Sequence, residues 1–203
     1  MDFLSTQTAR NLARSFAGET QARGRYTAYA GQARREKQEY LARIFETTAD
    51  NERAHAGEFL EMLNKHAGKP VENLEVSAGY PYALGNTGDN LQFAADGERT
   101  EHDDAYPSFA ETARREGFDD AARLWTLIAV VEGQHREIFE DARRQLADGS
   151  LYQKDRPTVW RCLNCGYVAE ALEPWETCPV CHKDRGWARG RVDEVRAPEK
   201  RSG

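Results

Sequence analysis

The chain has 203 residues, of which 31% are charged, and its formal net charge is −6. An acidic balance argues against nucleic acid as the main partner, and no segment approaches the roughly 20 apolar residues that a membrane-spanning helix needs. The first residues lack the basic region and apolar core of a secretory signal, so we expect a cytoplasmic protein with no membrane segment.

The first half of the chain predicts two long helices and a long connection. Apolar residues recur at helical spacing over about residues 4–33 and again over 37–66. Glycines and prolines scattered through residues 68–88 then predict an irregular segment. A connection of this length is expected where two helical hairpins are joined across the length of a four-helix bundle.

The second half predicts two more helices. The third is expected to begin near residues 86–90, where Thr87 or Asp89 could cap it, and to end at about residue 115. Pro107 should kink this helix, because proline lacks an amide donor and clashes with the preceding turn. The fourth helix is expected over about residues 119–147, where apolar residues again recur at helical spacing.

Glutamates and histidines occur in these helices in the order Glu, Glu-x-x-His, Glu-x-x-Glu, Glu-x-x-His. The set is Glu19, Glu52, His55, Glu98, Glu101, Glu132 and His135. Residues three apart share a helix face, so each pair can reach one site. Bundles that hold two metal ions use one Glu from each of two helices and a Glu-x-x-His from each of the other two. Carboxylate and imidazole ligands suit iron or manganese, so we predict a dimetal site.

A single Glu-x-x-His is more often a solvated helix face than a ligand pair. Two such pairs 80 residues apart, each with an upstream Glu at matched spacing, favour the metal site. Tyr26 and Tyr106 follow Glu19 and Glu98 by about two helical turns. Their spacing fits hydrogen bonding to ligands or to a bound peroxide, and it fits packing in the core equally well.

All four cysteines belong to one pattern, Cys162-x2-Cys165-x12-Cys178-x2-Cys181. This spacing predicts a tetrahedral thiolate site in a reducing compartment. Zinc would make the site structural, whereas iron would make it a one-electron carrier. The two knuckles resemble those of rubredoxin, which favours iron. In rubredoxin knuckles a residue at positive φ follows the second cysteine, and Gly166 and His182 can both adopt that conformation.

These features divide the chain into four parts. We expect a helical bundle over residues 1–150, a linker over 151–158, a small metal-bound domain over 159–188 and a mobile polar tail over 189–203. The small domain is too short to bury a sufficient core, so its metal must supply much of its folding free energy.

Longer motifs around the ligands resemble the rubrerythrin family over about residues 10–187. They are Phe16-Ala-Gly-Glu19-x-Gln-Ala-Arg-x-x-Tyr26, Glu52-x-x-His55-Ala56, Gly97-Glu98-x-x-Glu101, Tyr106-Pro107-x-Phe109, Ile128-Ala-Val-x-Glu132-x-x-His135 and Trp160-Arg161-Cys162. The resemblance implies a mainly α fold: a ferritin-like four-helix bundle with a small C-terminal rubredoxin-like metal-bound β domain. The second carboxylate on the third helix, Glu101, distinguishes this pattern from simpler ferritin-like sites.

The resemblance also implies the role of each ligand in an iron pair. Glu52 and Glu132 would bridge the two irons, and Glu19 and Glu98 would be terminal ligands. The cofactors would be these two irons and one iron in the four-cysteine site, although zinc can occupy either site.

Three further residues would act in catalysis. One iron would exchange His55 for Glu101 as its oxidation state changes, while His135 stays on the other iron. Tyr26 and Tyr106 would hydrogen-bond to the ligands.

The activity implied by the resemblance is that of a non-haem peroxidase, which reduces hydrogen peroxide to water in oxidative stress defence. Electrons would pass through the rubredoxin-like iron from an NAD(P)H-dependent reductase or a small carrier such as rubredoxin. The resemblance also implies a homodimer. Two alternatives stay open: a ferritin-like ferroxidase that handles iron, and a non-enzymatic helical module with a structural zinc ribbon.

Overall fold

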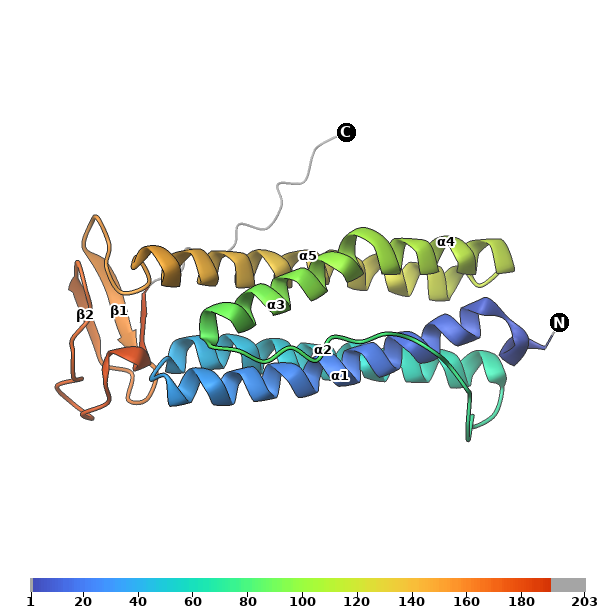
Figure 1. The fold of residues 1–203 in the computed structure, drawn as a ribbon, viewed down its shortest axis with the longest axis horizontal. Coiled ribbons are helices and arrows are strands. Elements are labelled where there is room, and N and C mark those ends of the chain that lie inside the picture. Colours follow the sequence, from blue (N-terminus) through green and yellow to red (C-terminus); the bar gives the residue numbers. More distant parts are fainter. Residues whose placement is uncertain (1, 191–203) are drawn as a thin grey trace.

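A computed structural model of the chain describes residues 2–190, in which long helices form a bundle with a small sheet at one end (Figure 1). After a short 3-10 helix at Phe3–Ser5, the helices are α1 (Gln7–Arg35), α2 (Glu39–Ala67), α3 (Thr87–Thr100), α4 (Tyr106–Glu116) and α5 (Asp119–Asp148). The first, second and fourth predicted helices correspond to α1, α2 and α5. The expected mainly α fold is confirmed. No helix in residues 2–190 is long and apolar enough to cross a membrane.

The third predicted helix is divided by a π-helical turn, η2 (Glu101–Ala105), just before Pro107. The Tyr106 amide donates to the Glu101 carbonyl five residues earlier. This wider turn stands where the kink was expected, because the ring of Pro107 clashes with a regular α-helical turn before it. The predicted caps were wrong: Asn86 caps α3, and its side chain accepts from the Asp89 amide at 2.9 Å.

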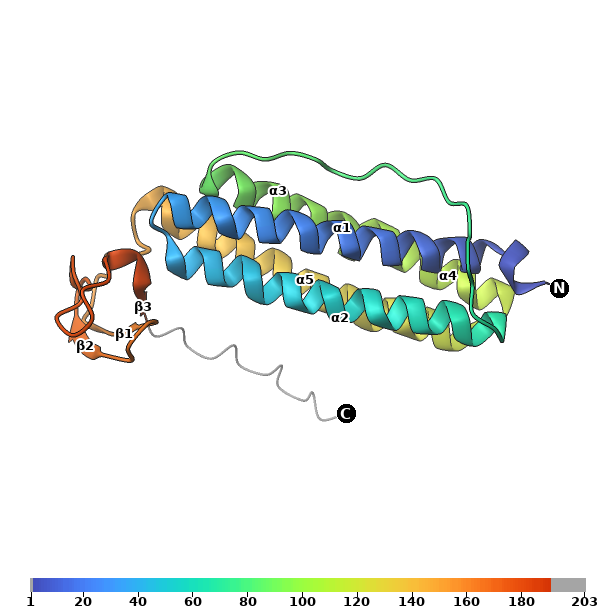
Figure 2. The same ribbon diagram turned by 90° about the horizontal axis from the view of Figure 1, so that it is seen from below.

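The connection between α2 and α3 runs as an extended strap along the outside of the bundle (Figure 2). Side-chain hydrogen bonds attach it to α1. Tyr80 Oη donates to the Arg14 carbonyl at 3.1 Å, Tyr29 Oη donates to the Ala83 carbonyl at 2.7 Å, and Gln21 Nε2 donates to the Pro81 carbonyl. This crossover joins the two hairpins, as the sequence predicted.

Two apolar clusters fill the bundle. The first includes Tyr26, Tyr29, Phe45, Leu91 and Phe139, and the second includes Leu12, Phe59, Tyr106, Ala113 and Trp125. Each large apolar side chain here contributes roughly 1.5–3 kcal/mol when it is fully buried. Because the two clusters supply the stability of the bundle, it can hold buried carboxylates that oppose folding.

The C-terminal domain is a three-stranded antiparallel sheet in the order β2-β1-β3. Its strands are β1 (Thr158–Cys162), β2 (Val168–Ala171) and β3 (Ala188–Gly190). We expected residues 189 and 190 in a mobile tail. They pair instead with β1, because the edge of that strand is free to accept a third strand. The rest of the expected tail lies outside the described residues.

The small domain packs on the bundle through a close backbone contact. A Cβ atom on Gly186 would lie 1.8 Å from the Lys37 carbonyl oxygen, so no larger residue fits. Around this contact, Tyr152 Oη donates to Gln38 Oε1 at 2.9 Å, and the Arg43 guanidinium lies 5.4 Å from the centroid of the Trp187 ring.

Gly186→Ala is therefore expected to displace the small domain from the bundle without unfolding the helices. The methyl group meets backbone rather than a flexible side chain, so the contact must open. We expect faster proteolysis near residues 151–158 and a changed tryptophan emission from Trp187. Gly79→Ala is the matched control, because no atom lies within 4 Å of the added methyl group. Equal proteolysis of both variants would contradict the prediction.

Candidate metal centres

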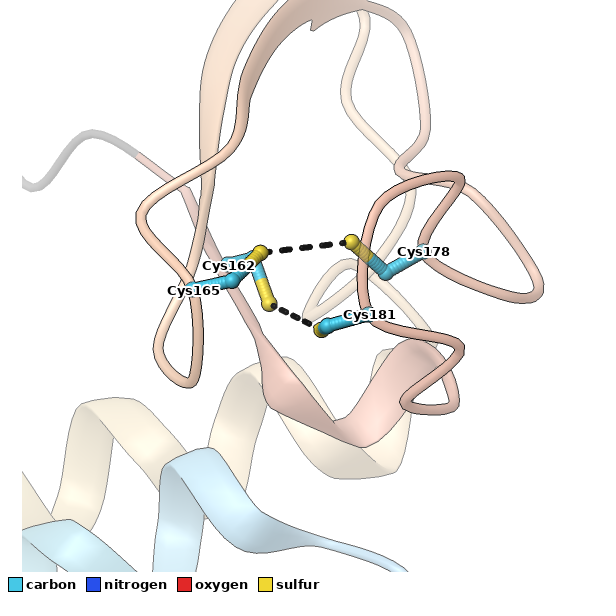
Figure 3. A group of neighbouring side chains, drawn as sticks. All are labelled: Cys162, Cys165, Cys178 and Cys181. Atoms are coloured by element: carbon cyan, nitrogen blue, oxygen red, sulfur yellow. Dashed lines mark hydrogen bonds between the residues drawn. The ribbon is translucent and has the colours of Figure 1, made fainter.

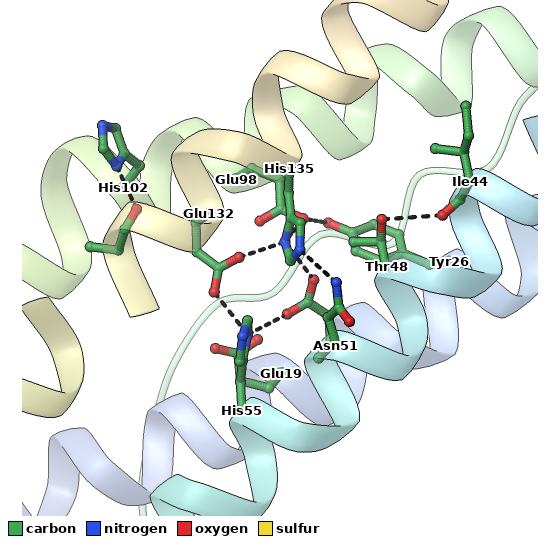
Figure 4. Close-up of polar contacts among 12 residues, drawn as sticks. Glu19, Tyr26, Ile44, Thr48, Asn51, His55, Glu98, His102, Glu132 and His135 are labelled. Carbon is green, nitrogen blue, oxygen red and sulfur yellow. Dashed lines mark hydrogen bonds and ion pairs between the residues drawn. The ribbon is translucent and has the colours of Figure 1, made fainter. Parts of the chain in front are cut away.

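Four helices bring the predicted carboxylates and histidines together in the middle of the bundle (Figure 4). Their ligand atoms form two groups, and within each group all atoms lie within 4.8 Å of one another. The first group is Glu19, Glu52, His55 and Glu132, and the second is Glu52, Glu98, Glu132 and His135. Glu52 and Glu132 belong to both groups. This is the arrangement that two neighbouring metal ions with two shared carboxylates require.

Each histidine contacts both shared carboxylates. His55 Nδ1 lies 2.9 Å from Glu52 Oε2 and 3.0 Å from Glu132 Oε1. His135 Nδ1 lies 2.8 Å from Glu132 Oε2 and 3.2 Å from Glu52 Oε1. The two imidazole rings stack with their centroids 5.9 Å apart. Both Nδ1 atoms therefore face the same space as the carboxylate oxygens.

Two tyrosines fix the outer carboxylates. Tyr26 Oη donates to Glu98 Oε1 at 2.6 Å, and Tyr106 Oη donates to Glu19 Oε1. The pairing crosses between helices: each tyrosine bonds the glutamate of the other hairpin, not the glutamate that precedes it in the sequence. Both rings also pack in the apolar clusters, so each tyrosine bonds a glutamate and packs in the core at the same time. Burial and the nearby carboxylates raise the pKa of both phenols, which therefore stay protonated donors.

The cluster fits a pair of metal ions. Glu19, Glu52, Glu98 and Glu132 are each no more than 1% exposed. Among the described residues, Glu19 Oε2 and Glu98 Oε2 are buried without a hydrogen-bond donor. Each outer carboxylate thus has one oxygen held by a tyrosine and one left for a metal. Two divalent cations would balance the four buried negative charges, which otherwise carry a large desolvation cost.

Glu101 lies apart from the two ligand groups. It is half-buried at the start of the π-helical turn, and its Oε1 lies 3.9 Å from the position of a Cβ on Gly18. Together with Tyr106 it borders a cavity of about 440 Å³. Burial and the charge of Glu98 raise the pKa of the Glu101 carboxyl well above its ordinary range. The exchange of His55 for Glu101 stays a prediction.

One polar neighbour of the cluster was not predicted. Asn51 Nδ2 lies 3.1 Å from His135 Nε2, the ring nitrogen that faces away from the carboxylates. A partner on the outer nitrogen fixes the orientation of a metal-binding imidazole. Asn51 directly precedes Glu52, but adjacent residues on a helix face different directions. Only the packing of α2 against α5 brings Asn51 to His135.

The buried charges give the metal-free protein an unusual pH dependence. Burial raises the pKa of Glu98 from 4.5 to about 8, although its contact with His135 opposes the shift. Burial alone would raise the pKa of Glu52, but contacts with His135 and His55 lower it to about 2. Burial would lower the pKa of His55, but contacts with Glu132 and Glu52 raise it to about 9.

The metal-free protein should lose stability between pH 6 and pH 8. The contribution of protonated Glu98 is complete below about pH 4.5 and is lost as the pH rises toward 8. Ionised Glu52, whose pKa is lowered, stabilises the fold above about pH 4.5, and this contribution is lost only as the pH falls toward 2. We expect the melting temperature to fall by roughly 5 °C between pH 6 and 8. Glu98→Gln should remove only part of this fall, because the contribution of protonated His55, whose pKa is raised from 6.5 to about 9, is lost over the same range. A melting temperature that is constant or rises over this range would contradict the prediction.

The four cysteines form a second centre in the small domain (Figure 3). All four Sγ atoms lie within 4.8 Å of one another, with 3.6 Å between Cys162 and Cys181 and 3.7 Å between Cys165 and Cys178. A tetrahedron with metal–sulfur bonds of 2.3 Å has edges of about 3.8 Å, so the sulfurs fit one tetrahedral metal. None of the four cysteines forms a disulfide.

The backbone of both knuckles has the expected form. Gly166 and His182 have φ angles of 78° and 59°, as we predicted for the residue after the second cysteine. The Gly166 amide donates to the Cys162 carbonyl and the His182 amide donates to the Cys178 carbonyl, both at 2.9 Å. The two knuckles therefore have the same local turn, and together they hold the metal from opposite sides.

This fold and these two centres define a class of protein: a ferritin-like dimetal carboxylate bundle joined to a rubredoxin-like domain. Comparison with known families gives the same result. The model of the family described as Rubrerythrin matches residues 10–143, and that described as Rubrerythrin, rubredoxin-like domain, matches residues 160–186. The chain belongs to the rubrerythrin family.

Individual relatives agree. Rubrerythrin-1 of Clostridium acetobutylicum is 42% identical over 177 residues, which cover 87% of this chain and 90% of that protein. A solved structure of nigerythrin in a partially reduced state has a TM-score of 0.61 at 29% identity, and covers 92% of this chain and 90% of that one. The bacterioferritin of Desulfovibrio desulfuricans has a TM-score of 0.59 at 22% identity, covers 70% of this chain and 81% of its own, and shares the fold.

The bundle thus carries a di-iron carboxylate site, and the C-terminal domain carries a rubredoxin-like four-cysteine site. The family relationship indicates an oxidoreductase, consistent with oxidative stress defence.

Proposed function

We propose that this protein reduces hydrogen peroxide to water in the cytoplasm, with electrons entering through the four-cysteine iron from an NAD(P)H-dependent reductase or a small carrier such as rubredoxin. When bound, the iron pair would supply two electrons to the O–O bond, and the thiolate iron would return them one at a time. The observation that carries the proposal is the presence in one chain of a two-metal carboxylate cluster and a four-sulfur site. A ferroxidase has no evident use for the four-sulfur site.

The residues around the cluster have separate tasks in this proposal. Tyr26 and Tyr106 hold Glu98 and Glu19 in place and keep their own protons in the buried site. Glu101 borders the cavity, where it would exchange a proton with an incoming peroxide, and it would replace His55 as a ligand. The surrounding apolar clusters exclude water from the reaction.

The distance that electrons would have to travel within one chain favours a dimer. The small domain contacts the bundle at Lys37, and Glu52 lies 15 residues further along the chain, roughly 20 Å away along the helix. A groove of about 810 Å³ extends along α2 and α5 between His135 and the small domain. A second copy whose small domain entered this groove would approach His135 more closely. Leu127, Val130 and Ile138 on α5 are 43–55% exposed, which suits a homodimer.

A steady-state assay tests the activity. The iron-loaded protein, an NAD(P)H-linked reductase and hydrogen peroxide are combined without oxygen, and oxidation of the nucleotide is followed. We expect one nucleotide consumed per peroxide and no release of oxygen. Light scattering should give a dimer. A large shell that takes up ferrous iron and ignores peroxide would instead indicate the ferroxidase, and a colourless zinc-filled four-cysteine site in the native protein would exclude the relay.

A further inference from the structure

The cavity beside Glu101 lies between α1, the crossover strap, α3 and α4. Side chains from all four segments line it, including Arg14, Arg25, Tyr80, Phe93 and Phe109. The strap residues Tyr80 and Pro81 are fixed to α1 by hydrogen bonds, so the cavity has a defined wall toward solvent. Its position gives a ligand direct access to Glu101 and Tyr106.

The cavity has room for a ligand larger than hydrogen peroxide. Its volume is about 440 Å³. Hydrogen peroxide has two oxygen atoms and needs the room of about two waters, roughly 60 Å³ at 30 Å³ each. A volume of about 440 Å³ falls in the range of sites that bind organic small molecules.

The lining combines aromatic surface with two guanidinium groups. The Arg14 guanidinium lies 5.6 Å from the centroid of Phe109, and that of Arg25 lies 5.3 Å from the centroid of Tyr26. Arg25 Nε donates to Gln21 Oε1 at 2.8 Å. Within residues 2–190, Arg14 Nε and Arg25 Nη1 find no acceptor, but both atoms are fully buried, so a ligand in the cavity can reach these guanidinium groups only through their other nitrogens. A guanidinium group favours an anionic oxygen as its partner.

The acidic residues at the cavity do not fill this role. Asp96 lies 3.1 Å from Arg99 and also accepts from Gln92, so its charge is already paired outside the cavity. Among the described residues Glu101 forms no ion pair within 4 Å with either arginine, although its charge raises the pKa of Arg25 from a longer distance.

We propose that this cavity binds an organic hydroperoxide that carries a carboxylate, with Arg14 and Arg25 holding the carboxylate and the aromatic rings contacting the carbon skeleton. The hydroperoxide end then faces Glu101 and Tyr106. The proposal rests on the proposed function for its chemistry: the O–O bond breaks, two electrons from the reduced iron pair and two protons are consumed, and one alcohol and one water are formed.

Binding can be tested without any metal. The probes are cumyl alcohol and its para-carboxylated form, which are the alcohols that reduction of the corresponding hydroperoxides gives, titrated by calorimetry into the metal-free full-length protein. We expect the carboxylated alcohol to bind about tenfold more tightly. Arg14→Gln should weaken this preference, because only Arg25 is left to hold the carboxylate, and Arg14→Lys should weaken it less. Arg23→Gln, an exposed arginine on the same helix, is the control and should keep all of it.

The reaction is tested with cumene hydroperoxide and its para-carboxylated form, each added to the reduced iron-loaded protein. A higher kcat/KM for the carboxylated peroxide, with a smaller advantage in Arg14→Gln, would support the proposal. Equal binding of the two alcohols to the unaltered protein would overturn it, whatever the variants do. Preferential binding without reduction of any peroxide would support the site and contradict the proposed function, so the two failures are distinguishable.

Discussion

Glu132→Ala is expected to remove both irons from the bundle while the four-cysteine iron stays. Glu132 belongs to both ligand groups and contacts His55 and His135, so its loss takes a ligand from each metal. The iron content should fall from about three ions per chain to about one, and peroxide reduction should stop.

Elemental analysis with the visible spectrum of the thiolate iron checks this result. The matched control is Glu137→Ala, on the same helix but exposed, which should keep about three ions. The metal-free Glu132→Ala protein should still fold, because both apolar clusters remain and one buried negative charge is removed. Two irons retained in the bundle of this variant would mean that Glu132 is not a shared ligand.

Cys181→Ala is expected to abolish turnover with an electron donor while the iron pair can still be oxidised once. The tetrahedral site loses one of four thiolates, so its iron is lost and the small domain loses much of its folding free energy. Turnover with an NAD(P)H-linked donor should fall to background. The chemically reduced iron pair should still be oxidised once by peroxide, because all its ligands lie on the bundle helices.

Stopped-flow absorbance measures the single oxidation, and nucleotide consumption measures the turnover. Val180→Ala, an exposed change between the two cysteines of the same knuckle, should leave both unchanged. If Cys181→Ala turned over at the normal rate, electrons would have to enter the bundle by another route.

Periodicity along a single helix predicted most of the architecture. The helices follow from apolar residues at helical spacing, and a pair such as Glu132 and His135 must share a face wherever the helix lies. The thiolate site was equally predictable, because two Cys-x2-Cys knuckles fix their own local geometry, down to the positive φ of Gly166. In both cases the information lies within a few neighbouring residues.

Features that depend on packing between distant segments were not predictable in this way. The crossed pairing of Tyr26 with Glu98 joins residues of different hairpins and depends on the packing of the bundle. The π-helical turn that presents Glu101 depends on how the chain relieves the constraint of Pro107. The contact of Gly186 with Lys37 depends on where the small domain docks. Of these three features only the turn leaves a local signal, Pro107, and that signal predicted a kink but not its π-helical form.

The most direct test of the account is a single anaerobic turnover. The iron-loaded protein is fully reduced, one equivalent of hydrogen peroxide is added per iron pair, and the absorbance of both iron centres is followed in time. We expect rapid oxidation of the iron pair, then slower oxidation of the thiolate iron, without release of oxygen. A slow response to peroxide combined with a fast response to oxygen and deposition of iron would contradict the account and identify a ferroxidase.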